Sequence, residues 1–268
     1  MNYKLPEELP PLLEPLREKI EATLRPYIAI APEITSETSW TQSKFGGLPY
    51  LPKNIEYPKA RDGHYLFLLA QINFAEVPHL EPFPQKGILQ FYIADDDLYG
   101  ADFDNPINQD GFRILYFPDP SDRVNDLTTD FSFLSKPDFS PLGDCISRLE
   151  FTAKVAPVSF VDYRSTELFQ AECDRLSDRD YWNLVGEYER FFMDTKHSQI
   201  GGYPYFVQDD PRDANAEKEQ LDCLLLQIPS SSSPDIMWGD GGIGNFFIKT
   251  SDLKKLDFTN VLYNWDCG

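Results

Sequence analysis

The sequence predicts an α+β fold of duplicated, mainly antiparallel β units related by a pseudo-twofold axis, with a few packing helices. Three observations predict it: short apolar runs separated by turn residues, three stretches with helical periodicity, and three sequence blocks that occur twice. Apolar residues make up 41% of the chain and aromatic residues 14%, which is enough to bury a large core. We therefore expect residues 1–268 to form a single globular domain.

Apolar residues at steps of three and four predict an opening helix over residues 10–27, which Pro26 ends or kinks. The same periodicity predicts a second helix over about 165–176 and a third over about 178–194. We expect the apolar stripe of the third helix to pack on the sheet; its members are Tyr181, Leu184, Val185, Tyr188, Phe191 and Phe192.

Between the first and second predicted helices the sequence contains short runs rich in Leu, Ile, Phe and Tyr. Residues 66–72, 88–93 and 113–117 are such runs, and Pro, Gly, Asp and Asn separate them. This alternation is typical of strands in an antiparallel sheet. The segment from about 95 to 165 is predicted to be a connection with strands of its own.

The repeated blocks occur in one order and at a nearly constant spacing. Residues 43–50 (SKFGGLPY) match 198–205 (SQIGGYPY), 68–72 (LLAQI) match 224–228 (LLLQI), and 87–93 (GILQFYI) match 242–248 (GIGNFFI). We infer an internal duplication of about residues 40–98 and 195–253. Two units with one apolar sheet face each are expected to share a core.

The charge of the chain indicates which partners to expect. It carries 44 acidic and 24 basic residues, a formal net charge of −20, which repels nucleic acid and anionic membrane surfaces. The charge would attract a basic protein, although it also simply keeps a protein soluble. No basic or apolar leader opens the sequence, and Cys145, Cys173, Cys223 and Cys267 form no Cys-x-x-Cys pair. We expect a cytoplasmic protein.

The repeated blocks also carry a resemblance to a known family. Residues 40–47 (WTQSKFGG), 69–74 (LAQINF), 87–92 (GILQFY), 200–204 (IGGYP), 225–228 (LLQI) and 238–240 (WGD) resemble the YwqG-like family, bacterial proteins classed as a domain of unknown function. The resemblance implies an α+β fold with a duplicated core. It carries over no catalytic or ligand-binding residues. Some similar proteins accompany secreted toxins, which implies an immunity or antitoxin role.

One small-molecule site is predicted, where the two Gly-Gly turns and two glutamines would line a cleft between the halves. Its residues are Lys44, Gly46, Gly47, Gln71, Gly201, Gly202 and Gln227, with Lys196 near the second turn. Backbone N–H groups of such turns can hold an anion, and a buried amide can bind a ligand. The alternative is structural: glycines that supply positive φ before a proline, and glutamines that brace the halves.

Other patterns point to no chemistry. The loop with Asp95, Asp96, Asp97, Asp102, Asp104 and Asp110 lacks the spacing of a calcium loop and is expected to be solvated. Residues 239–244 satisfy G-x-G-x-x-G but precede a predicted strand, which excludes a dinucleotide site. His64, His79 and His197 have no metal-ligand spacing. We predict no catalytic residues, metal or cofactor.

The sequence is compatible with two function classes. The first is a noncatalytic acidic binding protein that engages a basic protein partner. The alternative is an enzyme or small-ligand receptor with its site between the two halves. The sequence leaves open whether the protein is an enzyme.

Overall fold

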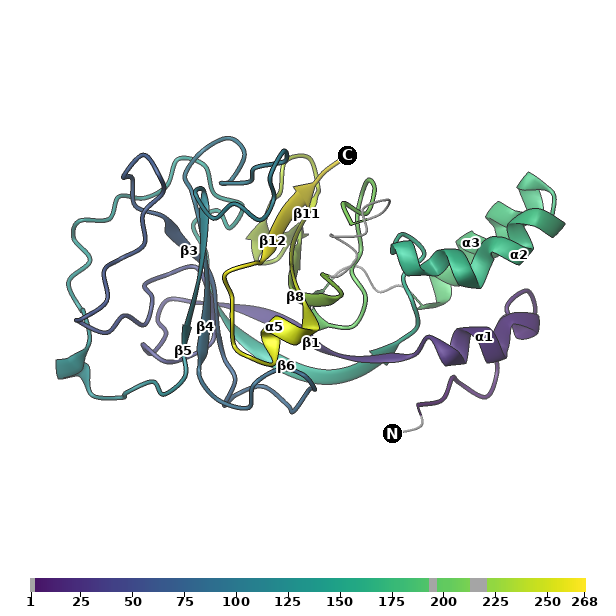
Figure 1. The fold of residues 1–268 in the computed structure, drawn as a ribbon, viewed down its shortest axis with the longest axis horizontal. Coiled ribbons are helices and arrows are strands. Elements are labelled where there is room, and N and C mark those ends of the chain that lie inside the picture. Colours follow the sequence, from purple (N-terminus) through teal and green to yellow (C-terminus); the bar gives the residue numbers. More distant parts are fainter. Residues whose placement is uncertain (1–2, 193–196, 213–220) are drawn as a thin grey trace.

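The computed structural model describes residues 3–192, 197–212 and 221–268, and its main feature is a ten-stranded sheet (Figure 1). Every pair of neighbouring strands in this sheet is antiparallel, and the order is β12-β11-β8-β7-β1-β6-β2-β3-β4-β5. The strands are β1 (Arg25–Thr35), β2 (Lys44–Phe45), β3 (Phe67–Asn73), β4 (Ile88–Ile93), β5 (Phe112–Phe117), β6 (Ile146–Ala156), β7 (Ser198–Gly201), β8 (Cys223–Pro229), β11 (Ile243–Ile248) and β12 (Leu262–Asp266). A separate hairpin pairs β9 (Ser231–Ser232) with β10 (Asp235–Ile236).

The two longest strands, β1 and β6, form the centre of the sheet. They pair along their whole length, from Arg25 opposite Ala156 to Thr35 opposite Ile146. On the free side of β6 the order is β2, β3, β4 and β5, and on the free side of β1 it is β7, β8, β11 and β12. The short strand β2 therefore pairs with β6, which is distant in sequence, and β7 pairs with β1.

Aromatic side chains join the two outer groups of strands. The ring of Phe246 on β11 lies 5.0 Å from that of Phe91 on β4, and the ring of Tyr263 on β12 lies 5.3 Å from that of Phe112 on β5. Both pairs belong to one buried cluster that includes residues of nearly every long strand. The predicted strands at 66–72, 88–93 and 113–117 are confirmed as β3, β4 and β5.

The three main helices, α1, α2 and α3, occupy one end of the molecule, beyond the ends of β1 and β6 (Figure 1). They are α1 (Arg17–Ala22), preceded by the 3₁₀ turn η1 (Glu14–Leu16), α2 (Thr166–Arg175), preceded by η3 (Tyr163–Ser165), and α3 (Asp178–Phe192); η2 (Val124–Asp126) and α5 (Thr250–Leu253) are short. Among the described helices, none is long and apolar enough to cross a membrane.

Two helix predictions need correction. The helix expected over 10–27 is shorter, because strand β1 begins at Arg25 and pairs Tyr27 with Lys154 of β6. Pro26 lacks the N–H that a helix interior requires, so sheet pairing prevails there. The stripe of α3 does not pack on the sheet: Leu184 and Tyr188 join a cluster with Leu16 of η1 and Phe169 of α2.

A largely buried ion network links the helical end to the second half of the sheet. The Arg212 guanidinium, which is 0% exposed, donates to Asp210 Oδ2 at 2.7 Å and to Asp162 Oδ2 at 2.9 Å. Asp162 also accepts two bonds of 2.6 Å from Arg164. Burial alone would raise the pKa of Asp162, but its bonds to Arg164 and the charge of Arg212 hold it below the ordinary value.

Candidate functional site

The two Gly-Gly turns have the backbone conformation that the sequence predicted. Gly46 and Gly47 have φ values of 66° and 72°, and Gly201 and Gly202 have 71° and 69°. A Cβ atom on Gly47 would lie 3.2 Å from Ile146 Cγ2, and one on Gly202 would lie 2.8 Å from Tyr27 Cβ. Positive φ and close packing against the central strands explain these glycines without a ligand.

One side chain braces each turn from within. The Lys44 ammonium, on a residue 1% exposed, donates to Leu48 O at 3.1 Å and to Ser39 O at 2.7 Å. Gln199, at the matching position, donates to Tyr203 O at 2.9 Å and to Gly201 O at 3.1 Å. In both turns a carbonyl four residues downstream is thus bound by the side chain that precedes the glycines.

Burial lowers the pKa of Lys44 to about 8, while the carboxylate of Glu76 opposes that shift. Because the folded pKa lies below the unfolded one, the unfolded chain binds more protons between about pH 8 and pH 10.5, and stability rises with pH there. We expect Lys44→Gln to remove a rise of about 3 kcal/mol over this window, at about 1.4 kcal/mol per pKa unit.

Urea unfolding from pH 7.5 to 9.5 measures how the free energy of unfolding changes with pH in the wild-type and Lys44→Gln proteins. The variant Lys86→Gln, at an exposed lysine, is the control. Unfolded tyrosines begin to ionise within this range, but they do so in both proteins, so the difference between the two isolates Lys44. If the wild-type and Lys44→Gln proteins change in parallel with pH, the buried ammonium is not the cause.

The predicted glutamines are buried and bonded to the chain itself. Gln71 Oε1 accepts from Tyr50 N at 2.9 Å and from Gln90 Nε2 at 2.8 Å, and Gln71 Nε2 donates to Trp40 O and Gln42 O. The matching Gln227 accepts from Tyr205 N at 2.7 Å. These bonds favour the bracing role over a ligand-binding one.

The predicted site residues fall into two separate groups. Lys44, Gly46, Gly47 and Gln71 surround β2, whereas Gly201, Gly202 and Gln227 surround β7, and both β1 and β6 lie between those strands. Gln227 and Gln199 line a pocket that Lys44 and Gln71 do not reach. Lys196 lies outside the described residues.

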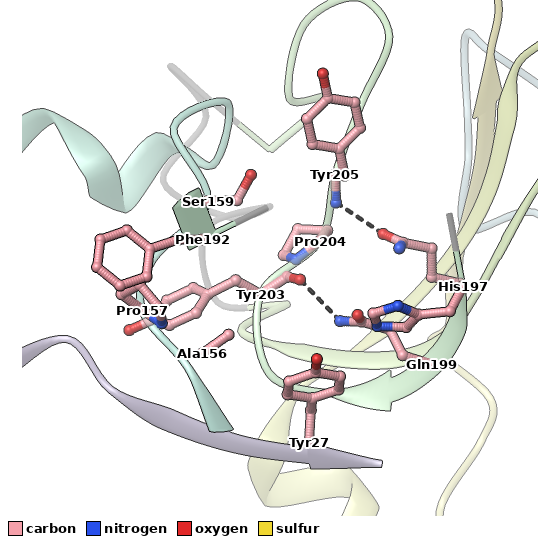
Figure 2. A pocket seen from close by; sticks show the side chains of 11 residues that line it. Tyr27, Ala156, Pro157, Ser159, Phe192, His197, Gln199, Tyr203, Pro204 and Tyr205 are labelled. Carbon is pink, nitrogen blue, oxygen red and sulfur yellow. Dashed lines mark hydrogen bonds between the residues drawn. The ribbon is translucent and has the colours of Figure 1, made fainter. Parts of the chain in front are cut away.

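That pocket lies between the sheet and the end of α3 (Figure 2). Tyr27 and His197 stack in it with ring centroids 5.5 Å apart, and Tyr203, Tyr205 and Phe192 complete an aromatic wall. Its volume of about 40 Å³ holds a few water molecules but not a metabolite. The buried Ser159 hydroxyl, which has no hydrogen-bond partner among the described residues, fits a water site here.

A much larger cleft, about 650 Å³, lies beside the hairpin of residues 59–65. Four carboxylates line it, from Asp62, Asp95, Asp96 and Asp110, and its basic or imidazole side chains are those of Arg61 and His64. Arg61 lies 3.5 Å from Asp110 Oδ2, with 84% of its side chain exposed. We call this feature the acidic cleft.

Two carboxylates of the acidic cleft accept hydrogen bonds from backbone N–H groups. Asp95 accepts from the N–H groups of Asp138 and Phe139, and Asp96 accepts from those of Leu98 and Gly100. Nowhere in the described ranges do three or more Asp, Glu, His or Cys side chains form a metal-binding group. Asp95 and Asp96 instead bind backbone N–H groups, and with Asp62 and Asp110 they contribute negative charge to the cleft.

Aromatic rings flank the acidic cleft. The ring of Tyr65, which is 40% exposed, lies 4.8 Å from that of Phe133, which is 42% exposed. The Lys59 ammonium lies 4.8 Å from the centroid of the Tyr65 ring. This surface therefore already attracts one cation through an aromatic face.

Sequence reasoning missed the acidic cleft because its wall comes from four distant segments, near residues 62, 95, 110 and 135. The run of aspartates was visible, but only the fold brings Asp62 and Tyr65 beside it. The strand predicted to follow the G-x-G-x-x-G match at 239–244 is confirmed as β11, which begins at Ile243.

The comparison with known families covers most of the chain. Residues 43–267 match the family described as "Domain of unknown function (DUF1963)", so the match includes both Gly-Gly turns and every strand except β1. No curated protein matches the chain. The protein therefore belongs to the DUF1963 family, whose function is not known.

Proposed function

We propose that this protein is a noncatalytic acidic binding protein that engages a basic protein partner through the acidic cleft. The observation that carries the proposal is the cleft itself, which combines about 650 Å³ with four carboxylates and an exposed tyrosine ring. Its size lies in the range of pockets that accept side chains or small ligands, unlike the 40 Å³ pocket of Figure 2.

The chemistry of the cleft favours arginine or lysine side chains. Carboxylates accept charge-assisted hydrogen bonds from guanidinium and ammonium groups, and tyrosine faces attract the same cations. The net charge of −20 would accelerate the encounter with a basic partner. The exposed Arg61 contact with Asp110 is a weak surface pair that an incoming arginine can replace.

The resemblance to YwqG-like proteins makes an immunity or antitoxin role one form of this function. In that form the basic partner is a toxin, and the cleft takes one or more of its cationic side chains. A cytoplasmic location agrees with such a role.

We also infer that the two halves descend from one duplicated unit. Matching residues make matching bonds: Gln90 donates to Tyr50 O at 2.7 Å, and Asn245 donates to Tyr205 O at 3.0 Å. The alternative function, an enzyme or receptor with a site between the halves, gains no support from the positions of Lys44 and Gln71, because their polar atoms bind the chain's own backbone.

An arginine-rich peptide tests the binding proposal. We expect the double variant Asp62→Asn, Asp110→Asn to bind the peptide about fivefold more weakly. Each of the two substitutions removes one partly exposed ionic contact with the peptide. Isothermal titration calorimetry at physiological salt measures the affinity. Asp62 and Asp110 are suitable because their side chains are 64% and 46% exposed, so the fold does not depend on them.

The matched control is Glu33→Gln with Asp119→Asn, two exposed acids that each pair with a cation elsewhere and change the net charge by the same amount. Salt screens charges that lie outside the cleft from a peptide bound in it. The control double variant should therefore weaken peptide binding by less than about twofold. Equal losses in the two double variants would mean that the peptide senses only net charge, and the cleft proposal would be wrong.

A further inference from the structure

The acidic cleft contains one side chain of the kind that changes its charge near neutral pH. Among the described residues that line the cleft, histidine occurs once, at His64. Histidine is the residue type whose unperturbed pKa places its charge change between about pH 5 and pH 8, whereas aspartate and arginine ordinarily keep their charges there. The lining therefore has a formal charge of −3 when His64 is neutral and −2 when His64 is protonated.

Both carboxylate oxygens of Asp62 contact His64. The backbone N–H of His64 donates to Asp62 Oδ1 at 3.0 Å, and His64 Nδ1 lies 2.8 Å from Asp62 Oδ2. This pairing raises the pKa of His64 above its ordinary value, first through the hydrogen bond to Asp62 and then through the charge of that carboxylate. The imidazole therefore gains its proton at a higher pH than an unpaired histidine would.

Backbone hydrogen bonds hold this pair at the wall of the cleft. Ala60 N donates to His64 O at 2.9 Å, which closes the turn that carries Asp62. Arg61 N donates to Asp110 O at 3.1 Å, which attaches the turn to the segment before β5. The side chains of Asp62 and His64 are 64% and 86% exposed, so a partner bound in the cleft can reach both.

The other charged groups around the pair leave Asp62 to His64. They are Arg61, Asp95, Asp96 and Asp110 in the lining, and Lys59 on the ring of Tyr65. Arg61 pairs with Asp110, and among the described residues His64 is the only basic side chain within ion-pair distance of Asp62. The protonation state of His64 thus decides whether Asp62 meets a partner as an anion or as half of an ion pair.

We propose that His64 makes binding in the acidic cleft depend on pH, because protonated His64 competes with a basic partner for Asp62. The inference rests on the proposed function, since it concerns the same cleft and the same cationic partner. It adds a direction: binding is tighter at pH 8.0 than at pH 5.5. By linkage, a bound partner favours the neutral imidazole and so lowers the pKa of His64 in the complex.

The arginine-rich peptide, acetylated at its N-terminus, is the probe at both pH values. We expect the wild-type protein to bind it about threefold more weakly at pH 5.5, because one exposed charge near the peptide has a modest effect in water. Isothermal titration calorimetry at constant ionic strength measures the two affinities.

Two substitutions fix the charge at this position. His64→Gln stays neutral and should bind the peptide equally at the two pH values. His64→Lys stays charged, and it should bind about threefold more weakly than the wild type at pH 8.0 and change little at pH 5.5. Because the His64 side chain is exposed, both variants should fold.

His79→Gln is the matched control, because His79 Nε2 lies 3.2 Å from Glu81 Oε1 in another exposed pair, which does not line the cleft. This variant should keep the wild-type response to pH. Equal wild-type affinities at the two pH values, or a wild-type response in His64→Gln, would overturn the inference and leave the proposed function standing. A protein that binds no peptide at pH 8.0 would overturn the proposed function as well.

Discussion

Replacing Arg212 with leucine should lower the free energy of unfolding by about 3–5 kcal/mol, as expected when one partner of a buried ion pair is removed. The Arg212 side chain is 0% exposed, and those of Asp162 and Asp210 are 0% and 2% exposed. Leucine cannot donate hydrogen bonds, so Asp210 loses its only charged partner among the described residues, and Asp162 keeps only Arg164.

The guanidinium also packs on rings, which adds to the loss. Its central carbon lies 4.2 Å from the centroid of the Phe247 ring and 5.0 Å from that of Tyr163. Urea unfolding followed by tryptophan fluorescence measures the effect. Arg148→Leu is the control, because Arg148 pairs with Glu33 at the surface, where such pairs contribute at most about 1 kcal/mol. Losses of similar size in the two variants would mean that the buried network does not hold the fold.

The strands could be predicted from the sequence because each buried strand is a short apolar run bounded by turn residues. The predicted run 88–93 coincides with β4, all six residues of which are buried. The helices α2 and α3 were predictable for a similar reason, since their apolar residues recur at steps of three and four. Local pattern suffices where a segment buries its own apolar face.

Local pattern fails where the partner is distant in sequence. Residues 25–27 continue the helical periodicity of the opening segment, but pairing with β6, more than a hundred residues away, makes them a strand. The buried network combines two Asp-x-Arg sequences, 162–164 and 210–212, which resemble ordinary surface charges in the sequence. The repetition of Asp-x-Arg was the one available signal, and it does not by itself indicate burial.

The candidate sites show the same limit. The Gly-Gly turns and glutamines were found because they recur in the sequence, and recurrence marked the residues that brace the fold. The acidic cleft does not recur, because it combines Asp62 of the first repeat with Asp110, which lies outside both repeats. Features shared by the halves therefore serve structure, and features in which the halves differ are the candidates for function.

Gln71 gives the sharpest test of that distinction, because the sequence allows it to be either a brace or a ligand contact. Gln71→Leu would leave the buried Tyr50 N and the partly buried Trp40 O and Gln42 O without the bonds they make to this side chain. At about 1–3 kcal/mol for each unsatisfied group, and allowing for non-additivity, we expect a loss of about 3–5 kcal/mol.

Urea unfolding without any added ligand measures the loss, and Gln170→Leu on the exposed face of α2 should stay within about 0.5 kcal/mol of the wild type. A structural brace destabilises the protein when it is removed, whether or not a ligand is present. A ligand contact weakens ligand-induced stabilisation while the ligand-free protein stays as stable as before. A Gln71→Leu protein that unfolds at the wild-type urea concentration would therefore make this glutamine, and the turn beside it, candidate binding residues again.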